Sequence, residues 1–277
     1  FDATGVGARP VPNNDFTAGT SFDTVTVSVG GYSIGGNSVS LSTGLVASNA
    51  SGTSTVSLVV GSAGTVTKSG AGTLTLSGAN TYTGATTISV GTLALGASSV
   101  VSTAGPLGTT AAGTTVASGA SLDLNSFSLT SAATEALSIS GTGAGGLGAL
   151  TNSSSTPSTY IGVITFVAAA SIEGHGGTTG TIAITGTPVS SAIGITLGGS
   201  AGGSISTDIA GARTLTKAGT GTWTLSGANT YTGATTISAG TLKLGASSAV
   251  ATDGPLGTTA AGTTVASSAS LDLNGFS

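Results

Sequence analysis

The chain has no cysteine or methionine, and only 5% of its 277 residues are charged. The absence of cysteine excludes disulfide bonds and is compatible with an exported bacterial protein. Five basic residues against nine acidic ones give a net charge of −4, so the chain lacks the basic track that nucleic acids require, and anionic membranes are disfavoured for the same reason. The only histidine, His175, is next to three glycines, and we interpret it as a solvated turn residue.

Long apolar runs are missing as well. The most apolar stretch, residues 161–170, is half of the roughly 20 residues that a membrane helix needs. Apolar residues nowhere recur at helical spacing for three turns. Apolar residues nevertheless make up 38% of the chain, and 48 glycines divide them into short runs that alternate with polar residues. This pattern predicts a packed all-β protein.

The chain contains one long segment twice. Residues 66–128 return as residues 215–277, and 52 of the 63 paired positions are identical. Within each copy, polar and apolar residues alternate with the period of a β-strand, and glycines mark the corners. The positions expected to form the inward-facing structural repeat are Leu74, Leu76, Ile88, Leu93 and Leu95 in the first copy and Trp223, Leu225, Ile237, Leu242 and Leu244 in the second.

The repeat spacing predicts a β-solenoid. Nineteen residues separate Leu74 from Leu93, enough for one circuit of a coil that places one leucine above the other. At roughly 20 residues per coil and ~4.8 Å between strands, the whole chain gives about 14 coils and a rod near 65 Å long. We expect one solenoid over residues 1–277, with spacer coils at 21–65 and 129–214, as a part of a longer protein.

Differences between the copies test this interpretation. Ala94 and Ala104 become Lys243 and Asp253, which places charges where the alternation predicts outward side chains. Leu74 becomes Trp223 at a position that we expect to face inward, and a tight interior does not accept that volume without rearrangement. Either the tryptophan lies at a wide corner or the assigned facing of its strand is wrong.

The segments GAGTLTLSGANTYTGATTISVGTLALG and GTGTWTLSGANTYTGATTISAGTLKLG resemble the autotransporter-associated β-strand repeat, also called the passenger-associated transport repeat. SISGTGAGGLGALTNSS and GTIAITG resemble the spacer coils of the same large bacterial surface proteins. The resemblance implies a right-handed parallel β-helix, exported by a Gram-negative cell to its outer surface or beyond. In autotransporters this repeat is associated with efficient secretion. It brings no catalytic residues.

Few residues are candidates for chemistry, and we assign no catalytic, cofactor-binding or metal-binding residue. Tyr82 and Tyr231 are possible contacts for surface glycans, although covering their own corners is the preferred interpretation. Asp123 and Asp272, in the two SLDLN segments, are expected to cap corners through side-chain to backbone hydrogen bonds. Because parallel β-helices also include polysaccharide-cleaving enzymes, a glycan-cleaving or glycan-binding protein is the alternative.

The preferred function is an extracellular structural or adhesive stalk without catalysis. Its expected partners are chains of its own kind, joined end to end or continuing the same polypeptide, and possible host or matrix glycans. A less favoured alternative is ice binding by Thr-x-Thr pairs such as Thr65/Thr67 and Thr73/Thr75. An ice-binding face requires these pairs at one fixed spacing, and their spacing in the sequence is uneven.

Overall fold

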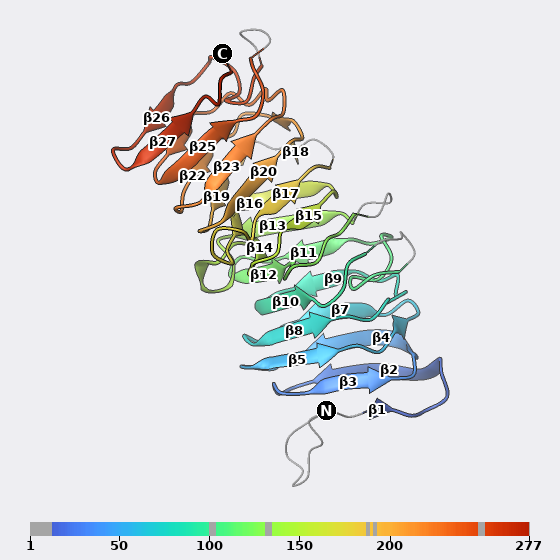
Figure 1. Ribbon diagram of the computed structural model, residues 1–277. Helices are drawn as coiled ribbons and strands as arrows, with labels where there is room; N and C mark the ends of the chain where they lie inside the picture. Colours follow the sequence, from blue (N-terminus) through green and yellow to red (C-terminus); the bar gives the residue numbers. More distant parts are fainter. Residues whose placement is uncertain are drawn as a thin grey trace.

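The computed structural model describes residues 13–99, 104–130, 135–186, 189–190, 193–248 and 253–276, with 189–190 described in the backbone only. These residues form a β-solenoid of about 10 turns. Figure 1 shows the coils stacked along one axis, from β1 near the amino terminus to β27 near the carboxyl terminus. The fold predicted from the sequence, an all-β solenoid with parallel ladders, is confirmed.

Nineteen strands form one continuous sheet. They are β1 (Asn13–Asn14), β2 (Thr20–Val27), β3 (Ser33–Gly36), β4 (Val39–Ala47), β5 (Thr53–Val56), β6 (Val60–Gly61), β7 (Thr65–Lys68), β8 (Thr73–Leu76), β9 (Thr86–Ile88), β10 (Gly91–Leu95), β11 (Thr114–Val116), β12 (Ala120–Asp123), β13 (Leu137–Gly141), β14 (Leu150–Asn152), β16 (Ile164–Gly174), β19 (Ile195–Gly198), β22 (Leu215–Lys217), β24 (Thr235–Ile237) and β26 (Thr263–Val265).

Two smaller sheets complete the described solenoid. The six-stranded sheet contains β15 (Ser158–Tyr160), β17 (Ile182–Ile184), β20 (Gly202–Ile205), β23 (Thr222–Leu225), β25 (Gly240–Leu244) and β27 (Ala269–Asp272). The two-stranded sheet pairs β18 (Val189–Ser190) with β21 (Ile209–Ala210). A single turn of 3-10 helix, η1 (Ala144–Gly146), is the one helical element of the described residues, and no described helix is long and apolar enough to span a membrane.

The core is a stack of aligned apolar side chains inside the coils. Leu74 of β8 pairs with Leu93 of β10, which pairs with Leu122 of β12, which in turn pairs with Leu150 of β14. All four leucines are fully buried. Alternation along each strand therefore turns these leucines into the interior on four successive coils, as the sequence predicts.

The number of coils is lower than expected from the repeat spacing. The ladder step from Leu74 to Leu93 is the short circuit that the sequence predicts, but the next two steps, to Leu122 and then to Leu150, each take a distinctly longer stretch of chain. The additional residues leave the strands unchanged and lengthen the loops between them, as in residues 142–149 between β13 and β14. The prediction of about 14 coils was thus wrong, because it assumed that every coil has the same length, and the structure has about 10 turns.

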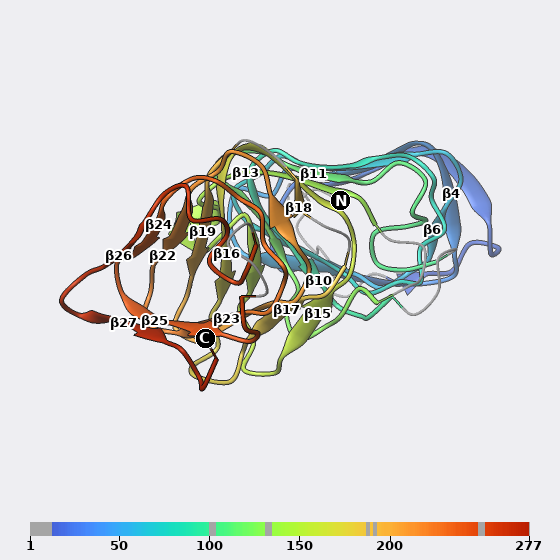
Figure 2. The ribbon, with the colours of Figure 1, turned by 90° about the horizontal axis from the view of Figure 1, so that it is seen from above.

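The two copies of the repeat occupy different columns of the solenoid. The long strand β16 pairs with β13 through its first half and with β14 through its second half. Only the second half continues the ladder, through β19, into β22 and β24. The column that holds β8 and β10 in the first copy therefore holds β22 and β24 in the second. Figure 2 shows the corresponding offset, with β4 and β6 on one side and β24 to β27 on the other.

Trp223 faces inward, as the alternation predicts, and lies within a strand, not at a wide corner. Its side chain is fully buried, and its Nε1 donates a hydrogen bond to the carbonyl of Gly198 at 2.8 Å. Its ladder partner on the preceding coil is Gly203, where an added Cβ would lie 2.9 Å from the indole Cη2. In the first copy the matching leucine, Leu74, pairs with Ser54. The missing side chain of Gly203 thus provides the space for the larger ring.

Candidate functional site

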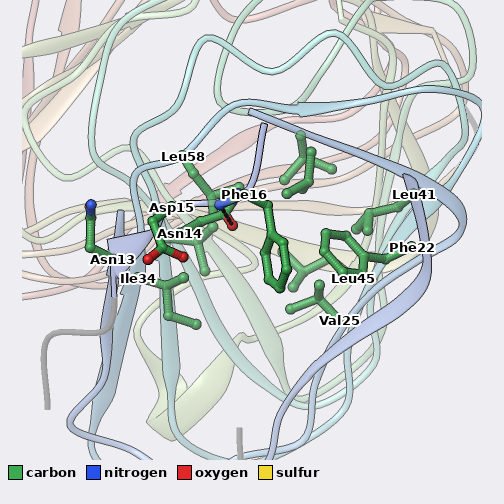
Figure 3. Close-up of a pocket in the computed structure, with 13 residues that line it drawn as sticks. Asn13, Asn14, Asp15, Phe16, Phe22, Val25, Ile34, Leu41, Leu45 and Leu58 are labelled. Atoms are coloured by element: carbon green, nitrogen blue, oxygen red, sulfur yellow. Dashed lines mark hydrogen bonds between the residues drawn. The ribbon is translucent and has the colours of Figure 1, made fainter. Parts of the chain in front are cut away.

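An apolar opening lies at the amino-terminal end, inside the first coils. It has a volume of about 260 Å³ and is lined by side chains of β1 to β6 and of residues 15, 16 and 58. The lining residues are Asn13, Asn14, Asp15, Phe16, Phe22, Val25, Ile34, Val39, Leu41, Leu45, Val56, Leu58 and Val60. In Figure 3 the ring of Phe16 lies beside that of Phe22, with Asn13, Asn14 and Asp15 on the other side. We refer to this opening as the apolar cavity.

Some inward side chains beside the apolar cavity are shorter than those in the same column on later coils. Along one inward column, Ile34 pairs with Val56, and Val56 pairs with Leu76, which pairs with Leu95. The valine is shorter than the leucines that follow it. Valine also lines the opposite wall, where Val39 pairs with Val60. The coils of the repeat are filled further by buried tyrosine and lysine side chains.

A second opening is a polar groove on the outside of the carboxyl-terminal half. Its volume is about 530 Å³, and threonine, serine and small residues from loops 175–181, 199–201 and 218–221 and from β20, β23 and β25 line it. Lys243 is the single charged residue in the lining. Its ammonium lies 3.8 Å from the carboxylate of Asp272 on the next coil, and both side chains are partly exposed. The outward position predicted for Lys243 is correct.

Two lysines of the described chain lie inside the solenoid and are held by backbone carbonyls. Lys217 is fully buried, and its ammonium donates to the carbonyls of Ala218, Gly219 and Ala239 at 2.8, 2.9 and 3.0 Å. The equivalent Lys68 is also fully buried and donates to the carbonyl of Gly70 and, at 3.4 Å, to that of Val90.

Burial lowers the pKa of both Lys68 and Lys217 to about 8, because the charged form loses its hydration. The sequence analysis missed this role, although alternation provides the signal. Lys68 stands two positions after the inward Val66, and Lys217 two after the inward Leu215. Each ammonium joins the corners of two successive coils.

Tyr82 and Tyr231 do not reach the surface. They are 1% and 0% exposed, and their hydroxyls hydrogen bond to the side chains of Thr86 at 2.8 Å and Thr235 at 2.6 Å. A buried ring cannot stack on a sugar, so glycan contact at these two tyrosines is overturned.

The neighbouring asparagines of the GANTYTG segments act as clamps between coils. Asn80 accepts from the backbone N–H of Val60 and donates to the carbonyl of Pro106, both at 2.9 Å. Asn229 makes the same two bonds, to Ile209 and Pro255, at 2.8 and 2.7 Å. The duplicated motif is therefore built for packing.

Asp123 caps a corner, as its sequence context predicts. Its Oδ1 accepts from the backbone N–H groups of Asn125 and Ser153 at 2.9 and 3.0 Å, and its Oδ2 accepts from the hydroxyl of Ser153 at 2.6 Å. Asp272 accepts from the N–H of Asn274 at 2.8 Å. Both carboxylate oxygens of Asp123 are thus engaged in the fold.

Two further acidic residues stand out. The carboxylate of Glu173, in β16, lies 3.3 Å from the imidazole of His175, which directly follows that strand. Both side chains are mostly buried, so the histidine is less solvated than expected. Glu135 is 8% exposed and accepts from the hydroxyl of Thr114 at 2.7 Å. Burial raises the pKa of Glu135 to about 7, against the lowering effect of that hydrogen bond. No pattern in the sequence indicates Glu135 as a buried acid.

Outward hydroxyls form a column that the uneven sequence spacing did not predict. Thr67, Thr87, Thr115, Ser138 and Thr165 are successive ladder partners, although the length of chain between neighbours varies from one coil to the next. Loops absorb the differences in length, so uneven spacing was the wrong criterion for stacking. In a neighbouring column, however, Thr24 pairs with Gly44, and Gly44 pairs with Thr65. A glycine thus separates the two threonines. Threonine pairs therefore do not form two parallel columns on this face.

Within the described residues, no three His, Cys, Asp or Glu side chains form a group that could hold a metal ion. The buried lysine, asparagine and aspartate side chains are instead bonded to backbone of neighbouring coils. The fold and its interior therefore define a solenoid whose buried polar residues join one coil to the next. This architecture is compatible with a non-catalytic structural domain.

Comparison with known proteins identifies the repeat. The family model described as Passenger-associated-transport-repeat matches residues 66–95 and 215–244. The chain thus carries two passenger-associated transport repeats, and the resemblance seen in the sequence is confirmed. This family is associated with autotransporter passenger domains, which Gram-negative bacteria export to the cell surface. Searches of curated proteins and of solved structures found no match.

Proposed function

We propose that the chain is part of the exported passenger region of a Gram-negative surface protein and serves there as an elongated structural or adhesive stalk without catalysis. The observation that carries this proposal is the pair of passenger-associated transport repeats, at residues 66–95 and 215–244. Both repeats form the same four strands, β7 to β10 and β22 to β25, and the boundaries of three of the four pairs are equivalent.

The interior supports a mechanical role. Parallel ladders pair each coil with the next, and buried lysine, asparagine and tyrosine side chains add hydrogen bonds that hold the coils together. Such bonds hold the corners where backbone groups would otherwise be buried without partners. A stalk needs this resistance to local opening, because proteases cleave chains that open.

The glycan-cleaving alternative gains no specific support. Glycoside hydrolysis uses a pair of carboxyl groups as acid, base or nucleophile, whereas the two oxygens of Asp123 accept hydrogen bonds from Asn125 and Ser153. Incubation with pectin and other acidic glycans tests this alternative. Release of reducing ends that the D123N or D272N substitution abolishes would favour an enzyme over a stalk.

Surface display is the decisive test of the proposal. An epitope tag inserted after Gly177, in an exposed turn, should be labelled by antibody on intact cells of the native host. Protease added to those cells should remove it. Labelling that requires cell lysis would refute the proposal.

Assembly remains a prediction. We expect the solenoid to continue in the same polypeptide or to associate end to end with other chains. Electron microscopy of native material should then show rods longer than a solenoid of about 10 turns. A uniform population of single short rods would contradict this expectation.

A further inference from the structure

We propose that the polar groove binds a neutral, extended oligosaccharide of β-1,4-linked hexopyranose units. This inference rests on the adhesive role proposed above and names the class of ligand for that role. The groove has a volume of about 530 Å³, which lies within the usual range of ligand sites. It includes residues of β20, β23 and β25, which follow one another along the solenoid (Figure 1).

Hydroxyl residues dominate the lining, and they are open to solvent. Four of them are exposed and three are partly exposed. They are Thr178, Thr181, Ser200, Ser204, Thr220, Thr222 and Thr224. Apart from Lys243, the rest of the lining is Ala201, Gly203 and Gly221, whose side chains are too small to fill the groove. The groove is therefore an accessible surface that presents many hydroxyls together.

The fold does not use these hydroxyls. Among the residues that the structure describes, none of the seven forms a hydrogen bond through its side chain. The neighbouring Thr179 differs, because its hydroxyl donates to the carbonyl of Ser155 at 2.7 Å. A hydroxyl both donates and accepts, as does each hydroxyl of a sugar. Sugar hydroxyls can therefore replace water in the groove without leaving a polar group unpaired.

The charges at the groove favour a neutral ligand. Lys243 is the single charged residue of the lining, and the carboxylate of Asp272, at 3.8 Å, offsets its charge. This distance is too long for a hydrogen bond, so the ammonium can still donate to a sugar oxygen. The net charge of −4 on the whole chain repels polyanions. Acidic glycans and phosphates are therefore disfavoured.

The spacing of the coils fits the length of a β-1,4-linked chain. Ser204, Thr224 and Lys243 are ladder partners on successive coils, and neighbouring strands lie ~4.8 Å apart. One hexopyranose unit with its glycosidic oxygen advances an extended chain by a similar length. Successive sugars of a chain along the solenoid axis thus meet polar groups on successive coils. A helical α-1,4-linked chain does not keep this spacing.

Titration of the untagged chain with cellohexaose tests the proposal. We expect saturable shifts of the backbone amide NMR signals of β20, β23 and β25. T222V/T224V removes two hydroxyls and keeps β-branched side chains in the strand; it should weaken cellohexaose binding about tenfold, as expected for the loss of two hydrogen bonds. K243A introduces the residue of the first copy, Ala94, and should weaken binding in the same direction.

T73V/T75V is the matched control, because these threonines occupy the equivalent strand β8 of the first copy and lie outside the groove. Its cellohexaose affinity should equal that of the unmodified chain. Absence of saturable shifts would overturn the proposal, as would equal affinities of folded T222V/T224V and T73V/T75V. Binding of maltohexaose or oligogalacturonate as tight as that of cellohexaose would overturn it too. None of these results changes the antibody labelling of intact cells, which tests the stalk separately.

Discussion

Lys68 and Lys217 should make the stability of the solenoid depend on pH. Burial lowers the pKa of each folded lysine from 10.5 to about 8. Between these values the unfolded chain binds more protons than the folded chain, so the free energy of unfolding rises with pH. The cost of burying the charge is fully present below pH 8 and disappears above pH 10.5.

The magnitude follows from the two pKa values. Integration of the difference in bound protons from pH 8 to pH 10 gives about 2 kcal/mol for each lysine, or about 4 kcal/mol for both. The window ends at pH 10, because burial raises the pKa of Tyr82, Tyr160 and Tyr231 above the ordinary value of 10. Ionisation of these tyrosines on unfolding lowers stability at higher pH.

Urea unfolding followed by circular dichroism at pH 7, 8, 9 and 10 measures the effect. We expect the free energy of unfolding of the unmodified chain to rise across this range relative to that of K68M/K217M. The control is K243M, which removes a partly exposed lysine from β25 and should keep the pH dependence of the unmodified chain. The reasoning is refuted if K68M/K217M and the unmodified chain show the same pH dependence.

Three further predictions concern single positions. G203A should destabilise the fold by about 1–3 kcal/mol through overpacking, since the added Cβ would lie 2.2 Å from the carbonyl oxygen of Ile182 and 2.9 Å from the ring of Trp223. W223L should relieve only the part of this loss that comes from the ring, measured in a double-mutant cycle by urea unfolding. N229A should cost about 1–3 kcal/mol in the same assay, because it leaves buried backbone groups of Ile209 and Pro255 without partners. For Glu135, a folded pKa of about 7 against 4.5 when unfolded makes stability fall as the pH rises from 4.5 to 7; E135Q should flatten that slope, and an unchanged slope would contradict it.

Alternation in the sequence was sufficient to predict the inward face of the repeat. Leu74, Leu93 and Trp223 lie inside, as their period of two requires. The number of coils could not be predicted in this way, because alternation is local and does not report the length of a loop between strands. For the same reason, the uneven spacing of the Thr-x-Thr pairs in the sequence did not show whether their threonines stack on successive coils.

The contacts between residues of different coils could not be predicted from the sequence alone. The space for Trp223 comes from Gly203 on the preceding coil, and the clamp made by Asn80 reaches Pro106 in the long loop that follows β10. Only the register of the ladders brings such residues together. The apolar opening near the amino-terminal end could not be predicted for a related reason, since side chains that are far apart in the sequence line it.

The pairing of Trp223 with Gly203 has a consequence for how the chain finds its correct structure. Near-identical segments of one polypeptide can exchange places during folding, and repeat proteins misassemble in this way. If the second copy took the place of the first, Trp223 would lie opposite Ser54, the partner of Leu74. A Cβ added at Gly203 would lie 2.9 Å from the indole ring, so a serine at the partner position leaves less room for the ring than the glycine does. One tryptophan and one glycine thus distinguish two segments that are otherwise nearly interchangeable.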